Sequence, residues 1–354
     1  MQMPFRMAHE CTRVAALGLS LLYSANLSVA AEDYFKGKTI SIYTGASAGD
    51  GYDVYARLLA VHYQRYIPGN PTIVIRNMPG AGSLKAANYI YEIAPKDGTA
   101  IGTVGGGTAT AELFKSKGVR FDPRYYAWIG SMNAEVGLVL AWKTVPVDRI
   151  HDLFNRELVV GGGGPTSGNV VFANVMNKVL GTRFKLIAGY KSTGDIALAI
   201  ERGELEGTAS YHYSSIITSK PDWITNGQVK VLLQDSLRPH SLFPDVPVVI
   251  DLARTAEQKD ILEVVFARQE MGRPFMLPPG TPAELVTLLR RTFDAAMRDP
   301  QLVSDAKRQR LDLNRPRSGE DIHGLIDRLY TFPADIVAKA AEATGENAAE
   351  GSAD

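Results

Sequence analysis

The segment Gly45-Ala46-Ser47-Ala48-Gly49 fits the pattern G-x-S-x-G, in which a serine at a sharp strand-to-helix turn acts as a nucleophile. Such a serine needs a histidine base, and His212, His240 and His323 occur later in the chain. Two features count against this chemistry. The turn follows the first predicted strand rather than several strands, and no HGGG-type oxyanion segment occurs. A serine hydrolase that uses Ser47 therefore stays an alternative.

The same segment also has the features of an anion-binding corner. Thr39 to Thr44 is rich in β-branched residues and predicts a strand, and residues 45–51 form a turn of small residues. A helix is predicted from Tyr52, and its N-terminal N–H groups and dipole favour an anion. A tight turn that binds nothing explains this segment equally well. We expect the apolar face of the helix to consist of Val54, Leu58 and Val61.

Turns of small residues recur after other predicted strands, at residues 77–82, 105–108 and 161–168. Ligands of open α/β sheets bind at the carboxyl ends of the strands, where such turns lie. Turns that face each other across two domains would enclose a small anion, with backbone N–H groups and hydroxyls as donors. The alternative for each hydroxyl is that it only caps its own helix. The hydroxyls concerned are those of Ser47, Thr108, Thr166 and Ser167.

Several other chemistries are excluded by the sequence. No G-x-G-x-x-G occurs, and no Walker lysine follows residues 105–107, so no nucleotide cofactor is expected. The histidines show no metal-ligand spacing, so no metal is expected either. Ser304 and Lys307 match S-x-x-K, but they lie in a charge-rich amphipathic helix that we expect to be solvated. The formal net charge is +0, without a basic cluster that would indicate nucleic acid.

The first 30 residues have the composition of a cleavable secretory signal. Arg6 and Arg13 flank the start of an apolar run, residues 14–22, and Ser28-Val29-Ala30 is a small-residue cleavage site. We expect export to the periplasm, with cleavage after Ala30 or Ala31. The run is too short to span a bilayer. The only cysteine, Cys11, lies in this segment, so the mature chain is expected to have no disulfide.

The order of predicted elements indicates an α/β fold in two domains. Strands at 72–76 and 99–104 follow the first one in βαβαβ order, which implies parallel pairing, and Ser83 is expected to cap the second helix. Residues 128–142 are expected to cross into the second domain, and LFPDVP, residues 242–247, to lead back. Crossings near 128–142 and 233–247 would then form a hinge. The strands of the second domain are expected at 158–160, 185–188, 206–210 and 229–233.

The C-terminal part predicts three capped helices. The run Thr281-Pro282-Ala283-Glu284 has the pattern of a capping box with proline at the first helical position, and Asp299 and Ser318 are expected to cap two further helices. The first of these helices is expected to bury Leu285, Leu288, Leu289 and Phe293. The predicted limits are 1–30 for the signal, 31–135 and 245–343 for domain 1, 136–244 for domain 2, and 344–354 for a flexible tail.

Six segments, taken in order, form a pattern that extends over nearly the whole mature chain. They are the first strand and turn up to Asp53, residues 77–82, 94–98, 189–191, 242–247 and 278–282. Together they resemble the periplasmic solute-binding proteins of tripartite tricarboxylate transporters, or Bug proteins. The resemblance implies a two-domain Venus-flytrap fold, each domain a mostly parallel sheet flanked by helices, and a non-enzymatic protein that binds a small organic carboxylate between the domains.

The resemblance also implies partners and site residues. The ligand would be delivered to the permease subunits of a membrane transporter, and the protein is expected to act as a monomer. A ligand sensor for a membrane signalling partner and a secreted serine hydrolase stay as alternatives. The residues expected to bind ligand are Ser47, Ala48, Gly49, Asp53, Gly106, Gly107, Thr108, Thr166, Ser167, Gly168, Tyr190 and Tyr211.

The first turn departs from the family pattern. Relatives usually have a proline-aromatic pair before a G-G turn, whereas this chain has Tyr43-Thr44-Gly45-Ala46. Asp50 adds a carboxylate near the expected anion site. If Asp50 faces the cleft it should oppose an anionic ligand, and if it caps the helix it should be nearly neutral.

Overall fold

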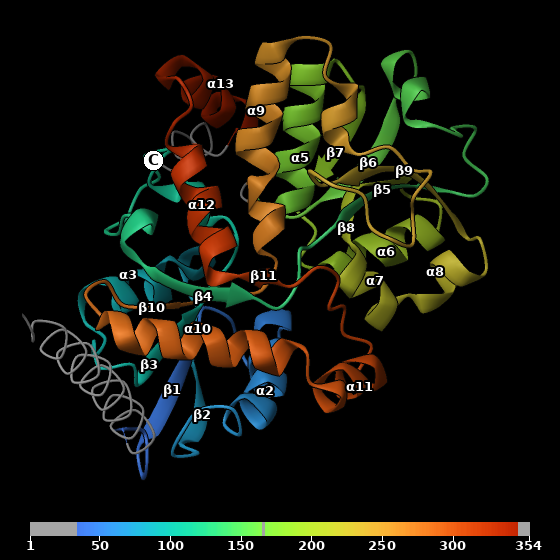
Figure 1. The fold of residues 1–354 in the computed structure, drawn as a ribbon. Helices are drawn as coiled ribbons and strands as arrows, with labels where there is room; N and C mark the ends of the chain where they lie inside the picture. Colours follow the sequence, from blue (N-terminus) through green and yellow to red (C-terminus); the bar gives the residue numbers. More distant parts are fainter. Residues whose placement is uncertain (1–33, 165–166, 346–354) are drawn as a thin grey trace, which may run out of the picture.

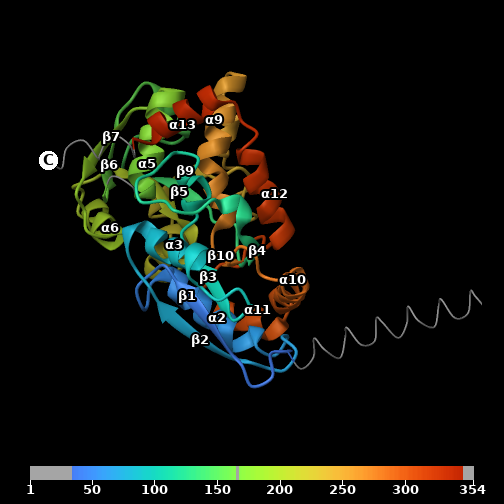
Figure 2. The same ribbon diagram turned by 90° about the vertical axis from the view of Figure 1, so that its left-hand side faces the viewer.

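The computed structural model describes residues 34–164 and 167–345. The predicted signal segment, Thr166 and most of the predicted tail lie outside the described residues. The molecule consists of two lobes, each built on a mixed β-sheet with helices packed against it (Figures 1 and 2). The predicted two-domain α/β fold is confirmed by this architecture. The expectation that each sheet is mostly parallel is wrong, because antiparallel strands are inserted into both sheets. Within the described ranges, no helix is both long and apolar enough to cross a bilayer.

The first sheet has the strand order β11-β4-β10-β3-β1-β2. Parallel pairs join β1 to β2 and to β3, as the βαβαβ pattern predicted, because the connections between these strands run through helices. Strand β10 is inserted antiparallel between β3 and β4. The strands are β1 (Thr39–Thr44), β2 (Thr72–Asn77), β3 (Ala100–Thr103), β4 (Ala127–Ser131), β10 (Pro274–Leu277) and β11 (Arg317–Ser318).

The second sheet has the order β7-β6-β8-β5-β9. Strand β6 pairs parallel with β7 and β8, whereas β5 runs antiparallel to β8 and β9. Strands β10 and β5 therefore run opposite to the parallel strands of their sheets. The strands are β5 (Gly137–Trp142), β6 (Leu158–Gly162), β7 (Phe184–Ala188), β8 (Gly207–His212) and β9 (Val229–Asp235).

Helices cover both lobes and follow the predicted order closely. In the first lobe these are α2 (Gly51–Tyr63), α3 (Leu84–Glu92), α4 (Thr108–Ala111), α10 (Ala283–Met297), α11 (Pro300–Arg308) and α12 (Gly319–Leu329), with short helices η1 (Ala81–Ser83) and η2 (Pro123–Tyr125). The second lobe carries η3 (Ile150–Phe154), α5 (Gly168–Val175), η4 (Met176–Leu180), α6 (Thr193–Glu201), α7 (Tyr213–Ser219), α8 (Pro221–Thr225), η5 (Val249–Leu252), α9 (Ala256–Phe266) and α13 (Ala334–Thr344).

The chain crosses between the lobes at residues 132–136, between β4 and β5, and again at η6 (Ala267–Met271), just before β10. Residues 330–333 later lead from α12 of the first lobe to α13 on the second. The first crossing was predicted. The expected return near residues 233–247 is wrong, because the Gln234 side chain donates to the Phe243 and Val246 carbonyls and folds this loop back onto β9. Helix α9 then packs against η4 and α13, and α13 against α5 (Figures 1 and 2). The domain limits stay a prediction, and they do not account for this packing.

Three local predictions are wrong for identifiable reasons. Val61 is 63% exposed, because α2 buries Tyr55, Leu59 and Tyr63 instead, a face rotated from the expected one. Ser83 does not cap α3, since its hydroxyl donates to the Gly45 carbonyl. Thr281 forms no capping box, since the helix begins one residue later than the pattern implied and the Thr281 hydroxyl donates to the Pro278 carbonyl. The caps at Asp299 and Ser318 are confirmed.

Candidate functional site

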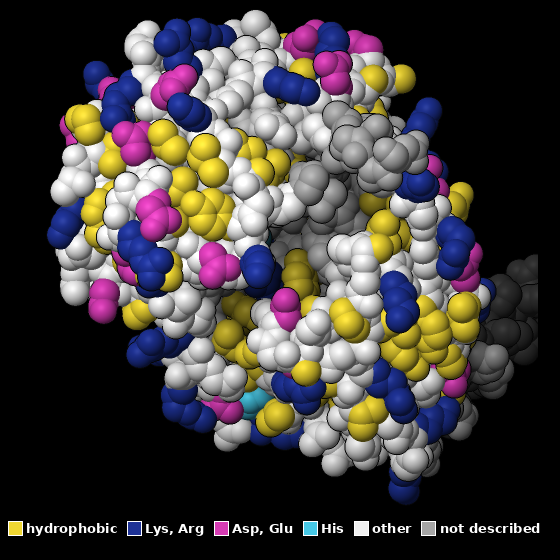
Figure 3. All heavy atoms as spheres, turned by 180° about the vertical axis from the view of Figure 1, so that it is seen from behind, with side chains coloured by type: hydrophobic (Ala, Val, Ile, Leu, Met, Phe, Trp, Pro, Cys, Tyr) yellow, Lys and Arg dark blue, Asp and Glu magenta, His cyan; other side chains and the backbone are white. Residues whose placement is uncertain are grey.

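A cavity of about 190 Å³ lies between the lobes, where the carboxyl ends of β3 and β6 and both crossings meet. Seen from behind, the surface is hollowed between the lobes (Figure 3). The first lobe and the crossings contribute Tyr52, Gly82, Gly105, Gly106, Gly107, Glu135, Arg268, Gln269, Met271, Gly272 and Arg273 to the lining, and the second lobe contributes Gly168, Phe172 and His212.

The antiparallel strands explain why charged residues reach this cavity. The parallel strands bring their carboxyl ends to one edge of each sheet, so β5 and β10 bring their amino ends to that same edge. Glu135 precedes β5 and Arg273 precedes β10, and both line the cavity. The sequence prediction used turns that follow strands. It therefore does not include Glu135 and Arg273, which precede theirs.

The turn after β3 forms one wall. The Gly106 N–H donates to the Tyr52 hydroxyl at 3.3 Å, which ties this turn to α2. A Cβ at position 106 would lie 2.5 Å from the Arg268 carbonyl oxygen, so the close approach of this turn to η6 requires glycine. Thr108 is buried, and its hydroxyl donates to the Gly105 carbonyl. The Thr108 hydroxyl, which was expected to donate to a ligand, therefore donates to the chain itself, and the backbone of the turn forms the wall.

The N-terminus of α5 forms the opposite wall. Gly168 is its first residue, and a Cβ added there would meet only Phe172, at 3.8 Å. Ser167 Oγ lies 2.7 Å from the Gly164 carbonyl oxygen and from Asn169 Oδ1, and its single proton is shared between these two acceptors. A Cβ at position 168 would therefore meet no steric conflict, and a longer side chain is expected to extend into the cavity that Gly168 lines.

Two arginines lie in the lining, although neither occurs in the predicted turns. The Arg273 guanidinium lies between the rings of Tyr52 and Tyr55, 4.7 and 4.8 Å from their centroids. Its Nη2 is 3.3 Å from Glu135 Oε2 and also donates to the Ser214 hydroxyl at 3.3 Å. Arg273 Nε makes no hydrogen bond with a described residue. Arg268 lines the cavity beside Gly107.

The titratable groups of the cavity favour an anion-binding charge state. Burial would raise the pKa of Glu135, but the charges of His212 and Arg273 and the Ser214 hydroxyl outweigh it and lower that pKa. Burial lowers the pKa of His212, and Arg273 adds to this effect against the opposing influence of Glu135. At neutral pH the lining therefore holds two arginines and one carboxylate.

An outer groove of about 390 Å³ adjoins the cavity and shares Tyr52, Gly82 and Gly105 with it. Ser47 lines this groove and is exposed. Asp50 also lines it, and its carboxylate accepts from the Tyr52 N–H at the start of α2. Asp50 therefore occupies both of the positions considered for it, because it caps α2 and also faces the groove.

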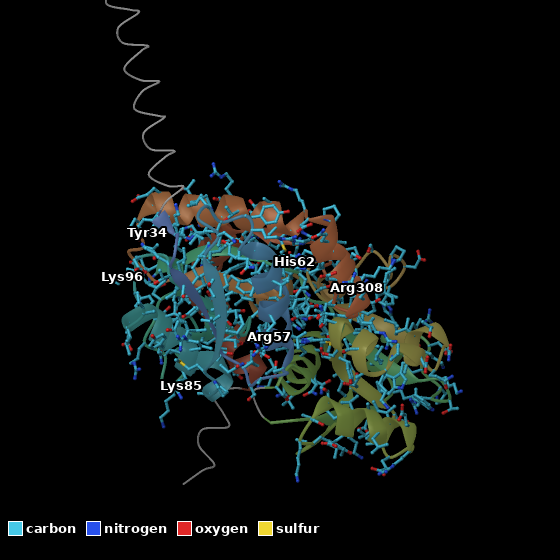
Figure 4. All side chains as sticks on the ribbon, turned by 90° about the horizontal axis from the view of Figure 1, so that it is seen from below. Tyr34, Arg57, His62, Lys85, Lys96 and Arg308 are labelled. Atoms are coloured by element: carbon cyan, nitrogen blue, oxygen red, sulfur yellow. The ribbon has the colours of Figure 1, made fainter. Side chains whose placement is uncertain are left out.

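Asp53 holds the first turn in place. Its carboxylate accepts from the Gly49 N–H at 2.8 Å, from Arg57, and from the Asn77 amide of the second turn at 2.9 Å. Burial would raise the pKa of Asp53, but the hydrogen bonds from Arg57, Gly49 and Asn77 outweigh it and lower the pKa to about 2. Figure 4 labels Arg57, which lies on α2. Because the chain supplies these donors, we assign Asp53 a positioning role.

The family model for receptors of the tripartite tricarboxylate transporter family matches residues 56–327. The chain belongs to this family. No curated protein matches it. Similar solved structures include a TctC solute-binding protein from Polaromonas without ligand, at 18% identity and a TM-score of 0.66, over 85% of this chain and 98% of that one.

Two further structures similar to this receptor come from Rhodopseudomonas palustris. MatC, solved with bound malate, is 19% identical with a TM-score of 0.59, over 85% of this chain and 99% of its own. A protein solved with adipate is 18% identical with a TM-score of 0.59, over 86% of this chain and 97% of its own. At these identities the likeness shows the shared fold.

The receptor brings some predicted residues together and separates others. Gly106, Gly107 and Gly168 line the cavity, and Ser47 lines the outer groove. Neither lining includes Ala48, Gly49 or Tyr190, and Thr166 lies outside the described residues.

Tyr211 was expected to bind ligand, but it is 2% exposed and packs against Trp223 in the core of the second lobe. The next residue, His212, lines the cavity instead, because adjacent strand residues point to opposite faces.

The hydrolase alternative gains no support from the described residues. None of their histidines forms a hydrogen bond with Ser47, and His62, His212 and His240 are engaged elsewhere or lie in other linings. No group of three or more metal-ligating side chains occurs in the described part of the receptor.

Proposed function

We propose that this receptor captures a small organic carboxylate in the cavity between its lobes and delivers it to the membrane permease of a tripartite tricarboxylate transporter. The observation that carries the proposal is the lining itself, with two arginines and one carboxylate between glycine-rich backbone walls. Membership of the receptor family supports the transport role. The malate and adipate bound by the two similar proteins support a carboxylate as the ligand class.

The size of the cavity favours a short ligand. At roughly 30 Å³ per water molecule, about 190 Å³ corresponds to about six waters. A four- or five-carbon carboxylate fits this space better than a long one. Arg273 Nε and the backbone N–H groups of the two glycine walls would then hold the carboxylate.

Cellular location and exclusion of catalysis belong to the same proposal. The predicted signal segment would direct the receptor to the periplasm, and N-terminal sequencing of exported protein should find a start near Ala31 or Glu32. We propose no enzymatic activity. The receptor should therefore not hydrolyse a chromogenic ester, and Ser47→Ala should change nothing in that assay.

A thermal-shift screen against mono- and dicarboxylates tests the binding function. A ligand present at 100 times its dissociation constant should add about 2.7 kcal/mol of stability. If no small carboxylate shifts the midpoint while another class of solute does, the proposed ligand class is wrong.

A further inference from the structure

A second cavity of about 570 Å³ opens between the lobes away from the glycine-rich turns, and we call it the α7–α11 groove. Helix α7 of the second lobe and α11 of the first face each other across it (Figure 1). It shares no lining residue with the cavity described above. Its walls are Tyr213, Ile217 and residues 240–242 on one side, and Val303, Ala306, Lys307 and residues 310–314 on the other.

The floor of the groove contains buried polar groups without partners. The His240 ring is 3% exposed, and its Nδ1 accepts from the Leu242 N–H, so the proton of neutral His240 lies on Nε2. That Nε2 makes no hydrogen bond and lies 3.7 Å from Asp312 Oδ1, which is too long for one. Asp312 Oδ2 and Asn314 Nδ2 are also buried and unpartnered among the described residues. Such groups need a ligand or water partner.

The walls combine apolar surface with positive charge. Leu242 and Val303 are 63% and 47% exposed, and Ile217 lies beside them in the lining. Neither Lys307 nor Arg310 forms a side-chain hydrogen bond or ion pair with a described residue, whereas the neighbouring Arg308 pairs with Asp305. Two unpaired cations against the single carboxylate of Asp312 make the groove complementary to an anion with an apolar tail.

We propose that the α7–α11 groove is a second binding site, for a medium-chain aliphatic carboxylate. Its carboxylate head would lie between Lys307, Arg310 and the Nε2–H of His240, and its alkyl chain would cover Ile217, Leu242 and Val303. A volume of about 570 Å³ is within the range of small-molecule sites, and it is too large and apolar to be selective for a short dicarboxylate.

Calorimetry with octanoate tests this site, with octanol as the uncharged control. Octanoate should bind and octanol should bind more weakly. The double substitution Lys307→Ala with Arg310→Ala should weaken octanoate binding by about tenfold, or about 1.4 kcal/mol. Arg308→Ala removes a charge from the same helix at a position that is not part of the groove lining, and should leave binding unchanged (Arg308 is labelled in Figure 4). Val303→Asp should also weaken octanoate, because it places a negative charge on an exposed wall.

The variant Gly168→Leu, which fills the inter-lobe cavity, separates this site from the proposed transport site. Octanoate should bind this variant as it binds the wild type. Three results would each overturn the second site: no octanoate binding at millimolar concentration, loss of octanoate binding in Gly168→Leu, or full affinity in the Lys307/Arg310 double variant. None of them would contradict binding of a short carboxylate in the inter-lobe cavity.

Discussion

Arg273 and Glu135 form an ion pair, with Nη2 3.3 Å from Oε2, that joins the two segments where the chain crosses between the lobes. Glu135 is 2% exposed and Arg273 is 6% exposed. Each lies just before the antiparallel strand of its lobe. The pair therefore places a charged group in the cavity wall and fixes the two crossings against each other.

Glu135→Gln should destabilise the receptor strongly. The variant keeps the size of the side chain but leaves the buried Arg273 charge without its partner, which costs about 3 kcal/mol. Urea unfolding measures the change. Glu320→Gln is the matched control, since Glu320 pairs with Arg290 but its side chain is 66% exposed, and its loss should cost less than about 1 kcal/mol. Equal stability of the two variants would contradict the structural role of the pair.

Asp53→Asn should lower the free energy of unfolding by about 1–2 kcal/mol at pH 7, because the folded pKa of about 2 lies below the usual value of 3.8. The loss is kept to this size because the partner Arg57 is partly solvated. The sign follows from the lowered pKa. The contribution of Asp53 is complete above about pH 4 and disappears as the pH falls towards 2. Unfolding midpoints of the wild type and variant should therefore converge in acid. A constant difference from pH 7 to pH 2 would show that the carboxylate charge is not responsible.

Asp50→Asn should leave stability nearly unchanged, because asparagine caps a helix about as well as aspartate. Asp50 lines the outer groove, so removing its charge should tighten an anionic ligand by about two- to fivefold at low salt. The gain should shrink at high ionic strength. Calorimetry at two salt concentrations checks this, and tightening that does not depend on salt would rule out an electrostatic cause.

Asp235 provides a pH test of the second lobe. Burial raises its pKa to about 8, the nearby Ser210 hydroxyl offsets only part of this, and neither carboxylate oxygen has a hydrogen-bond partner among the described residues. Because the folded pKa is raised, the stability contribution is complete below about pH 4 and is lost as the pH rises to about 8.

Asp235→Asn should therefore stabilise the receptor more at pH 8 than at pH 5, by at most about 1.4 kcal/mol per pH unit. Thermal unfolding at both pH values measures this difference. A variant that is equally stabilised, or destabilised, at both values would show that Asp235 does not titrate in the folded state.

Local sequence patterns predicted the framework well where an element is defined by its own residues. Strand β1, the glycine turn and the start of α2 are encoded within one short stretch, and so are the caps at Asp299 and Ser318. Predictions failed where distant contacts decide the outcome. The Gln234 side chain folds the loop at residues 242–247, and the hydroxyl of Ser83 is used by Gly45.

The lining of the candidate cavity includes some of the predicted residues and not others, for the same reason. Gly106, Gly107 and Gly168 follow strands and carry a visible turn signal. Arg273 and Glu135 precede strands instead. They reach the cavity because β10 and β5 are inserted antiparallel, and no local sequence pattern indicates that pairing. Tyr211 was chosen in place of His212, a shift of one residue that moves a side chain to the opposite face of the sheet.

Calorimetry of Gly168→Leu with the best short carboxylate from the screen tests the central claim most directly. A Cβ at this position makes only an ordinary contact with Phe172, so we expect the variant to fold with a similar melting temperature while its side chain occupies the cavity. Gly324→Leu is the matched control, since position 324 lies in α12 with nothing within 4 Å of an added Cβ. We predict that Gly168→Leu abolishes binding and Gly324→Leu retains it. Full affinity in a folded Gly168→Leu variant would show that the carboxylate binds elsewhere.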